Sequence, residues 1–452
     1  MAGTSGSRLF PVSEQVPKAL LPVGNRPLVS YLFASLKKCG AGRVVVVTTA
    51  RFQGLVRAAV EADLAEGVLE ADCAVVSVDE MLGSAGAVRE ALARDETLRR
   101  SSELLVVAGE TVVGWHSLRE LVHRHRLRGA GCSVLFAAET ASTRRVDEAD
   151  VEFVSMDEHD VIADTRALLD LEDEDEDGEG AVVKFSKSML RRNLQIRADL
   201  NDVHCYVFDV AALTNSLAGI GPDSSLKADV LPALAEAYSR GAKTDDPLED
   251  PYRRYQRLVD REVEEEHSSP FVLAVVVQGD DKADDDDSAL GSVLAARIRT
   301  LPAYAALCRR CVARACAEPQ SNLRGRLAKR DGTLIGPGTE LGEKANVKHA
   351  TIGARCRIGT RAKINNSVLF DDVHVHDGAV VQNSVLCSNA VVKEKANLND
   401  VQVGANAVVP PSTTLKNESF LADDDDDDDE TGGATVVAAR EPGGVRTTED
   451  GL

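Results

Sequence analysis

The sequence lacks the long apolar segments that a membrane requires. A helix that spans a bilayer needs about 20 mostly apolar residues, and no such stretch occurs. No apolar segment follows a basic start either, because Met1 leads directly into small and polar residues. We therefore expect no membrane span and no signal peptide, and we expect the protein in the cytosol.

Cysteine is also sparse and shows no disulfide pattern. The nine cysteines are odd in number and scattered, which is typical of a reducing compartment. Cys308, Cys311 and Cys316 cluster, but a zinc site needs a fourth ligand at a recognisable spacing, and none is nearby. Cys308 and Cys311 lie one helical turn apart, so we expect buried helix thiols.

The chain has no basic region to balance its acidic ones. Its net charge of −21 comes from 73 acidic and 52 basic residues. Acidic runs at 172–179, 280–287 and 423–430 hold 21 of the acids and one lysine, so the remainder carries 52 acids against 51 bases. Such runs are typical of solvated loops; the alternative is attraction of a lysine-rich partner. Because no basic patch emerges, we expect no direct contact with nucleic acid.

What the sequence does contain is a regular aliphatic repeat between residues 335 and 415. Its anchor residues follow spacings of 6, 6 and 5, so the unit is 17 residues. The anchors are Ile335, Leu341, Val347, Ile352, Ile358, Ile364, Leu369, Val375, Val381, Leu386, Val392, Leu398, Val403, Val409 and Leu415. Period six fits neither a strand nor a helix, but it fits a short strand plus a corner, repeated three times per coil. Such hexapeptide arrays form parallel β-helices, and this one resembles the left-handed family.

Small or β-branched residues stand four positions beyond the anchors of the six-residue steps. They are Thr339, Ala345, Cys356, Ala362, Val373, Ala379, Ala390, Ala396, Ala407 and Thr413. We expect the anchors to stack inside a triangular prism and the small residues to lie near its corners. Such a prism does no chemistry itself, and its flat faces usually serve subunit assembly. His374 and His376 alternate with anchors, so we expect them at the surface or a corner rather than as an acyltransferase base.

The first part of the chain alternates apolar runs with helical patterns. This alternation predicts an α/β fold with a parallel or mixed sheet covered on both faces. Strands are predicted at 43–49, 73–78, 103–108, 132–136, 203–208 and 271–277, and helices at 51–65, 85–94, 116–126 and 304–316. His123 and His125 fall on the basic helix 116–126, for which a solvated face is the default expectation.

These patterns divide the chain into four parts. We predict an α/β domain over 1–240 with an acidic insertion at 171–180, and a connecting region over 241–332 with the acidic run 280–287. The left-handed β-helix is predicted over 333–420, and a disordered acidic tail over 421–452.

Three loop motifs stand in the predicted α/β domain. Residues 3–9 read GTSGSRL, residues 17–23 read PKALLPV, and residues 82–87 read LGSAGA. Glycines let backbone N–H groups approach phosphate oxygens, and nearby cations neutralise phosphate charge. The motifs resemble the sugar-nucleotidyltransferase pattern GGxGTRL…PKPxLPV and its LGTAGA loop. Thr4 replaces a glycine of that pattern, and Ala19 replaces a proline.

The resemblance implies a set of nucleotide-binding residues. They are the glycines and cations of these loops, Gly3, Gly6, Arg8, Lys18, Gly83 and Gly86. In an enzyme, Arg8 and Lys18 would be the cationic catalytic pair. Glu110 falls where active members place a magnesium-binding aspartate, but it is one methylene longer, and a misplacement of about 1 Å can cost ~10²-fold in rate. No convincing second carboxylate accompanies it, since Asp202 is expected to be a surface residue.

The phosphate loop has an unusual position in the chain. A loop of this kind follows a buried β-strand, whereas only Met1 and Ala2 precede Gly3. We therefore expect the first strand of the sheet to be missing, which leaves open whether the true N-terminus lies upstream of Met1.

Two protein groups combine a nucleotidyltransferase-like domain with a left-handed β-helix. They are the nucleotide-sugar pyrophosphorylases and the gamma and epsilon subunits of translation initiation factor 2B. PVGNRPL at 22–28, DVHCY at 202–206 and LIGPGT at 334–339 are similar to segments of the gamma subunit.

Resemblance to the gamma subunit implies a non-catalytic, regulatory chain without a cofactor. Its partners would be epsilon-like and other subunits of the complex and initiation factor 2, on which the complex promotes exchange of GDP for GTP. The alternative is an enzyme similar to mannose-1-phosphate guanylyltransferase, which would use magnesium and GTP with Arg8, Lys18 and Glu110 in its site.

Overall fold

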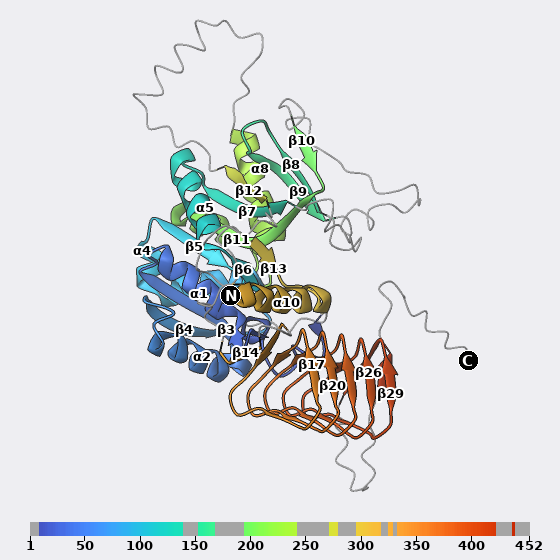
Figure 1. Cartoon of the computed structure of the whole chain (residues 1–452). Coiled ribbons are helices and arrows are strands. Elements are labelled where there is room, and N and C mark those ends of the chain that lie inside the picture. The colour runs from blue at the N-terminus through green and yellow to red at the C-terminus, as the bar shows by residue number, and fades with distance from the viewer. Residues whose placement is uncertain are drawn as a thin grey trace, which may run out of the picture. The chain divides into compact units, whose positions relative to one another are not determined.

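A computed structural model of the chain describes residues 9–138, 152–167, 194–241, 271–278, 295–317, 324–328, 332–421 and 436–438. The chain divides into two compact units (Figure 1). The first contains Val29–Asp284 and Ser292–Arg297, and the second contains Thr4–Leu28 and Ile298–Leu452. The sequence pattern placed residues 4–28 with the α/β domain; the predicted domain bounds stay predictions. The three acidic runs lie outside the described residues.

The first unit is a mixed α/β fold, as predicted. Its largest sheet has four strands in the order β12 (Val272–Gln278), β7 (Cys132–Ala138), β11 (Leu200–Asp209) and β5 (Glu103–Val107). Strands β12 and β7 are parallel, whereas β11 runs antiparallel to both of its neighbours. The expected parallel or mixed sheet is therefore confirmed in its mixed form.

Three smaller sheets complete the strands of this unit. Strands β3 (Arg43–Thr49) and β4 (Asp72–Val78) are parallel, and β6 (Thr111–Val113) and β13 (Ala295–Arg297) are antiparallel. The third sheet consists of β8 (Glu152–Met156), β9 (Ile162–Ala167) and β10 (Gln195–Arg197). Among the described strands, β3 pairs only with β4 and β5 only with β11. The predicted absence of a first strand stays a prediction.

The helices predicted over 51–65, 85–94 and 116–126 correspond to α2 (Gln53–Ala65), α3 (Ser84–Arg94) and α5 (Trp115–Arg128). The described part of the first unit also contains helices outside the predicted segments, namely α1 (Leu28–Lys38), α4 (Glu96–Arg100), α7 (Val210–Leu217) and α8 (Leu231–Gly241). One hydrophobic core joins the elements, since Val47 of β3, Val106 of β5 and Leu213 of α7 belong to the same buried cluster. No helix in the described part of the chain is both long and apolar enough to cross a bilayer.

The second unit contains the predicted β-helix, whose coils stack along one axis (Figure 1). The first face is a sheet of β14 (Arg326–Ala328), β15 (Thr333–Ile335), β18 (Thr351–Ile352), β21 (Val368–Leu369), β24 (Val385–Leu386), β27 (Gln402–Val403), β30 (Glu418–Phe420) and β31 (Val436–Ala438). The second face consists of β16 (Glu340–Leu341), β19 (Arg357–Ile358), β22 (His374–Val375), β25 (Val391–Val392) and β28 (Val408–Val409). The third face consists of β17 (Asn346–Lys348), β20 (Lys363–Asn365), β23 (Val380–Gln382), β26 (Asn397–Asn399) and β29 (Thr414–Lys416).

Parallel pairing places each anchor on the anchor 17 residues later. Ile335 pairs with Ile352, and Ile358 with Val375, so the aliphatic side chains form continuous columns inside the prism. Leu341 of the first coil is an exception, because it is 40% exposed. It lies on the outermost strand of the second face, where no earlier coil covers it.

The corners of the prism require the left-handed backbone region. One residue per corner has a positive φ, and most of these residues are not glycine. The three series are Gly338, Arg355, Asp372, Asn389 and Asn406; Lys344, Arg361, Gly378, Lys395 and Ser412; and His349, Asn366, Asn383, Asp400 and Asn417. Asn and Asp tolerate this region because their short polar side chains bond locally, whereas Lys and Arg have no such compensation.

Other segments of the second unit cover the first face of the prism. The Tyr304 ring of α10 (Leu301–Ala317) packs edge-on against Phe370, with ring centroids 6.5 Å apart. Tyr304 also donates its hydroxyl hydrogen to the carbonyl of Pro22 in β1 (Pro22–Val23). Asn25, in the turn to β2 (Arg26–Pro27), donates to the carbonyl of Ile352 at 2.9 Å. The first face is therefore an internal packing surface.

Burial in α10 agrees with the expectation for its cysteines. Cys308 and Cys311 are both buried, so the prediction of helix thiols is confirmed for this pair. Burial raises the pKa of Cys308 to about 12, which keeps the thiol protonated at neutral pH.

Candidate functional site

The predicted nucleotide-binding residues are distributed over both units. Gly3, Gly6 and Arg8 lie outside the described residues. Lys18 begins the short 3₁₀ helix η2 (Lys18–Leu20) in the second unit. Gly83, Gly86 and Glu110 belong to the first unit.

Gly83 and Gly86 lie against the turn that precedes the π-helix η6 (Leu226–Val230). A Cβ on Gly83 would stand 2.1 Å from the carbonyl oxygen of Asp223, and one on Gly86 would stand 2.1 Å from that of Pro222. The backbone N–H of Gly83 donates to the Pro222 carbonyl at 3.1 Å. Both glycines are therefore needed for packing within the chain, whether or not a nucleotide binds there.

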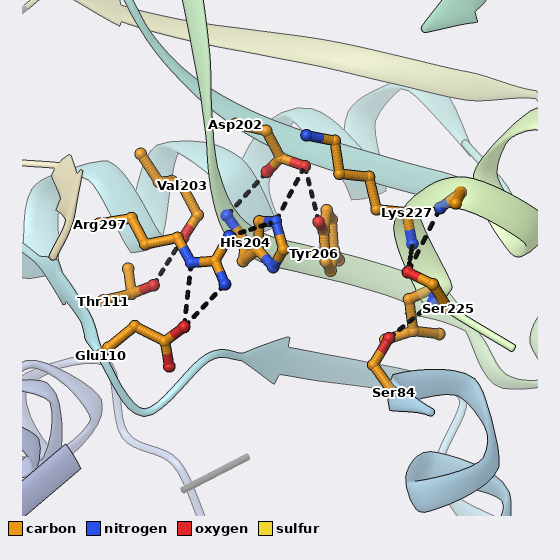
Figure 2. Close-up of polar contacts among 12 residues, drawn as sticks. Ser84, Glu110, Thr111, Asp202, Val203, His204, Tyr206, Ser225, Lys227 and Arg297 are labelled. Carbon is orange, nitrogen blue, oxygen red and sulfur yellow. Dashed lines mark hydrogen bonds and ion pairs between the residues drawn. The ribbon is translucent and has the colours of Figure 1, made fainter. Parts of the chain in front are cut away.

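The same turn uses further polar groups at the start of α3. The N–H of Ala85 donates to the Ser224 carbonyl at 3.0 Å, and the Ser84 hydroxyl accepts the N–H of Leu226 at 2.7 Å (Figure 2). The backbone N–H groups of Gly83 and Ala85, which the N-terminus of α3 could otherwise offer to an anion, are thus already hydrogen-bonded within the chain. Contact between this loop and a nucleotide base stays a prediction.

Glu110 forms an ion pair with an arginine that the sequence analysis did not single out. Strand β13 pairs with β6 so that Arg297 lies opposite Thr111, the residue after Glu110. The Arg297 guanidinium donates to Oε1 of Glu110 from Nε at 3.0 Å and from Nη2 at 2.7 Å (Figure 2). The Glu110 side chain is only 9% exposed, so this charge pair is largely shielded from water.

A bulge in β11 positions the second part of the site. The pairing register between β11 and β7 shifts between Asp202 and Tyr206, and His204 within the bulge has a φ of 54°. Asp202 accepts the backbone N–H of His204 and the hydroxyl hydrogen of Tyr206, both at 2.7 Å. Asp202 is 3% exposed, so its expected surface position is wrong. The bulge turns the Asp202 carboxylate inward, where it accepts hydrogen bonds from the Tyr206 hydroxyl and the His204 backbone N–H.

Burial and the neighbouring carboxylate keep Tyr206 protonated. Both effects raise the pKa of Tyr206 well above its ordinary value, burial more than the charge of Asp202. The phenol is therefore a stable hydrogen-bond donor to Asp202 and does not supply a proton at neutral pH.

Arg297 also contacts His204 and thereby joins both parts of the site. Its Nη1 lies 2.8 Å from Nε2 of His204 (Figure 2). Arginine only donates hydrogen bonds, so Nε2 of His204 is the acceptor in this contact. We call Glu110, Arg297, His204, Asp202 and Tyr206 the Arg297 network. It connects β13, β11 and the loop before β6.

The Arg297 network does not fit a magnesium ion. Magnesium requires oxygen ligands at short, regular distances, and Oε1 of Glu110 already accepts two hydrogen bonds from a cation. In the described residues, no three His, Cys, Asp or Glu side chains are grouped to hold a metal.

The structure also corrects the expectation for the basic helix. His123 is exposed, but His125 is buried, at 3%, and its Nδ1 lies 2.9 Å from the Ser133 hydroxyl of β7. Burial is the main cause that lowers the pKa of His125. The expected solvated face is therefore wrong for His125, because that side of α5 packs on the sheet. His374 and His376 are half-exposed on the second face, as expected.

No sequence signal pointed to Arg297. Arg297 is 187 residues from Glu110 along the chain. It follows the acidic run 280–287, and no sequence motif includes it. The β-bulge at His204 was equally unmarked, although DVHCY itself was recognised as a motif.

Two family models match this chain. The model described as "Nucleotidyl transferase" matches residues 1–145, and the model described as "EIF2B subunit epsilon LbH domain" matches residues 320–415. The chain thus carries a nucleotidyltransferase domain followed by a left-handed β-helix of the EIF2B type. The predicted fold class is confirmed.

Individual relatives come from both groups. The chain is 30% identical to "Mannose-1-phosphate guanylyltransferase 1" of Arabidopsis thaliana over 135 residues, which cover 30% of this chain and 36% of the relative. It is 23% identical to "Translation initiation factor eIF2B subunit gamma" of Dictyostelium discoideum over 222 residues, 45% of this chain and 47% of the relative. The matches thus span about a third to a half of the length of these relatives.

Proposed function

We propose that this chain is a non-catalytic, gamma-like subunit of an eIF2B-type complex. The EIF2B-type β-helix and the similarity to a gamma subunit over 222 residues support this assignment. In this proposal the complex, located in the cytosol, promotes exchange of GDP for GTP on initiation factor 2. The chain contacts epsilon-like and other subunits as well as the factor.

The contact between Glu110 and Arg297 is the observation that carries the proposal. In the enzyme reading, Glu110 is the carboxylate for magnesium, and magnesium neutralises the phosphates of the nucleotide. Here the Arg297 guanidinium, whose Nη2 lies 2.7 Å from Oε1 of Glu110, neutralises the charge of this carboxylate in place of a metal ion. The network therefore favours a structural role for the first unit.

The β-helix contributes the surfaces that such a subunit needs. Its first face is covered within the second unit, whereas the outward side chains of the third face alternate with buried anchors and are mostly exposed. Flat strand faces of this type suit contacts with other subunits.

The alternative is a nucleotidyltransferase similar to mannose-1-phosphate guanylyltransferase. Similarity to the Arabidopsis enzymes favours it, and it would use Arg8 and Lys18 as catalytic cations with GTP and magnesium.

One assay separates the two functions. The full chain is incubated with GTP, mannose 1-phosphate and magnesium, and pyrophosphate release is measured beside Lys18→Ala. The subunit proposal expects no release that depends on Lys18. Steady turnover that disappears in Lys18→Ala would overturn it and establish the enzyme.

A second experiment tests assembly directly. Co-expression with an epsilon-like subunit is expected to yield a stable complex and to raise the melting temperature of this chain, because a partner that binds only the folded state stabilises it. If the two chains elute separately at micromolar concentration and the melting temperature is unchanged, the assignment to this complex fails.

A further inference from the structure

The first two coils of the β-helix gather four cations on one side. Lys344 and Arg361 occupy the same corner in successive coils. Lys348 and Lys363 lie on the paired strands β17 and β20 of the third face. All four residues are exposed. The sequence shows no such cluster, because other residues separate these cations along the chain and only coil stacking assembles them.

These cations have no partners in the described part of the chain. No ion pair or side-chain hydrogen bond involves Lys344, Lys348, Arg361 or Lys363 there, whereas Arg355 on another corner binds both oxygens of Asp372. Glu343 is the acidic neighbour of Lys344 in the chain. The four unpaired positive charges lie within two coils and repel one another. Binding of anionic groups among them is therefore favoured.

The third face as a whole suits an extended polypeptide. Its outward side chains are mainly amides and lysines, without acidic or aromatic residues; they are Asn346, Lys348, Lys363, Asn365, Val380, Gln382, Asn397, Asn399, Thr414 and Lys416. Amide and ammonium groups bind carboxylates and backbone carbonyls. Single-stranded nucleic acid instead favours aromatic side chains on which bases stack.

We propose that the basic coil pair, Lys344, Lys348, Arg361 and Lys363, is a docking site for an acidic polypeptide segment of a partner protein. The segment lies on the third face, with its carboxylates among the four cations. This inference goes beyond the proposed function, since it concerns a surface of the β-helix and holds whichever activity the first unit has.

Binding of a defined acidic peptide tests the site. A fluorescent peptide of eight glutamates is titrated with the full chain at low salt, and its anisotropy is measured. We expect Lys348→Glu/Lys363→Glu to weaken binding by roughly tenfold or more, because two attractive charges become repulsive. We also expect the wild-type affinity to fall as salt rises.

A matched variant on the same prism is the control. Lys395→Glu/Lys416→Glu changes charge by the same amount at the same corner and the same face, but in later coils. When the two variants are compared at 0.1 M salt, where the screening length is about 10 Å, we expect it to bind within about twofold of the wild type. Unchanged thermal unfolding of both variants shows that the fold is intact.

Three results would overturn the proposal. One is the absence of wild-type binding at low salt, and another is equal loss of affinity in the two double variants. The third is tighter binding of single-stranded RNA of the same length, lost in Lys348→Glu/Lys363→Glu, which would assign the surface to nucleic acid.

Discussion

The two units of this chain differ in the sequence separation of the residues that contact one another. In the β-helix, contacts repeat at a spacing of 17 residues, as between Arg355 and Asp372 or Asn366 and Asn383. In the α/β unit, the decisive contacts join residues far apart, as between Glu110 and Arg297 at a separation of 187. In a periodic sequence, the repeat length thus determines which residues come into contact. In an irregular sequence, only the completed fold determines them.

The first prediction tests the irregular unit at its tightest contact. Gly86→Ala adds a methyl group 2.1 Å from the Pro222 carbonyl, so the turn must move. We expect destabilisation of the first unit by about 2–4 kcal/mol, although alanine is otherwise the better helix residue. Hydrogen exchange of α3 and urea unfolding measure the effect.

Its control is a helical glycine without such a contact. Gly54→Ala in α2 meets nothing within 4 Å, so we expect it to be neutral or to stabilise by up to about 1 kcal/mol. Similar behaviour of the two variants would show that the turn does not depend on Gly86.

The second prediction tests the columns of the periodic unit. Leu398 is fully buried between Val381 and Leu415 of the neighbouring coils. Leu398→Ala is expected to cost about 2–5 kcal/mol, through lost burial and a cavity. Because coils contact mainly their neighbours, exchange protection should fall in β23, β26 and β29 and stay unchanged in β11. Loss of hydrogen-exchange protection throughout both units would contradict the expectation that the effect stays within neighbouring coils.

The sequence predicted more of the β-helix than of the site, for a physical reason. Each anchor faces another anchor, so the 6-6-5 spacing alone determines the inward residues, apart from the exposed Leu341 at the end of a column. The prediction for Asp202 failed because a β-bulge, not a residue pattern, turns its carboxylate toward Tyr206. Arg297 could not be found because its role depends on the pairing of β13 with β6.

The third prediction concerns corner strain in the β-helix. Lys395 has a φ of 56°, a region in which a residue with a Cβ is strained. Lys395→Gly is therefore expected to stabilise the β-helix by about 1 kcal/mol, as measured by its thermal unfolding. Glu394→Gly at the neighbouring position, which lacks a positive φ, should instead cost about 0.4–1 kcal/mol. Equal effects would show that the corner stores no strain.

The fourth prediction concerns a pH dependence in the α/β unit. The pKa of His125 is lowered in the folded state, so below the ordinary histidine value of about 6.5 the unfolded chain binds a proton that the folded chain does not. Stability should therefore decrease as pH falls from about 6.5 toward the lower folded pKa, by about 1.4 kcal/mol per unit of pKa difference.

A variant isolates this contribution. His125→Gln cannot titrate, so its unfolding free energy between pH 7 and 5 should vary less than that of the wild type. His123→Gln, at an exposed position of the same helix, should retain the wild-type slope. Identical slopes in all three proteins would exclude His125 as the cause.

The first face of the β-helix ends in an antiparallel strand at each side. Strand β14 runs against β15, and β31 runs against β30, whereas every pair between them is parallel. A stack of identical coils is a template on which the next molecule can add its own coil, and repeated addition produces a fibre. A reversed strand at either end presents the wrong hydrogen-bonding pattern for another parallel coil. On this face, both ends of the stack therefore differ from the parallel edge with which another coil would pair.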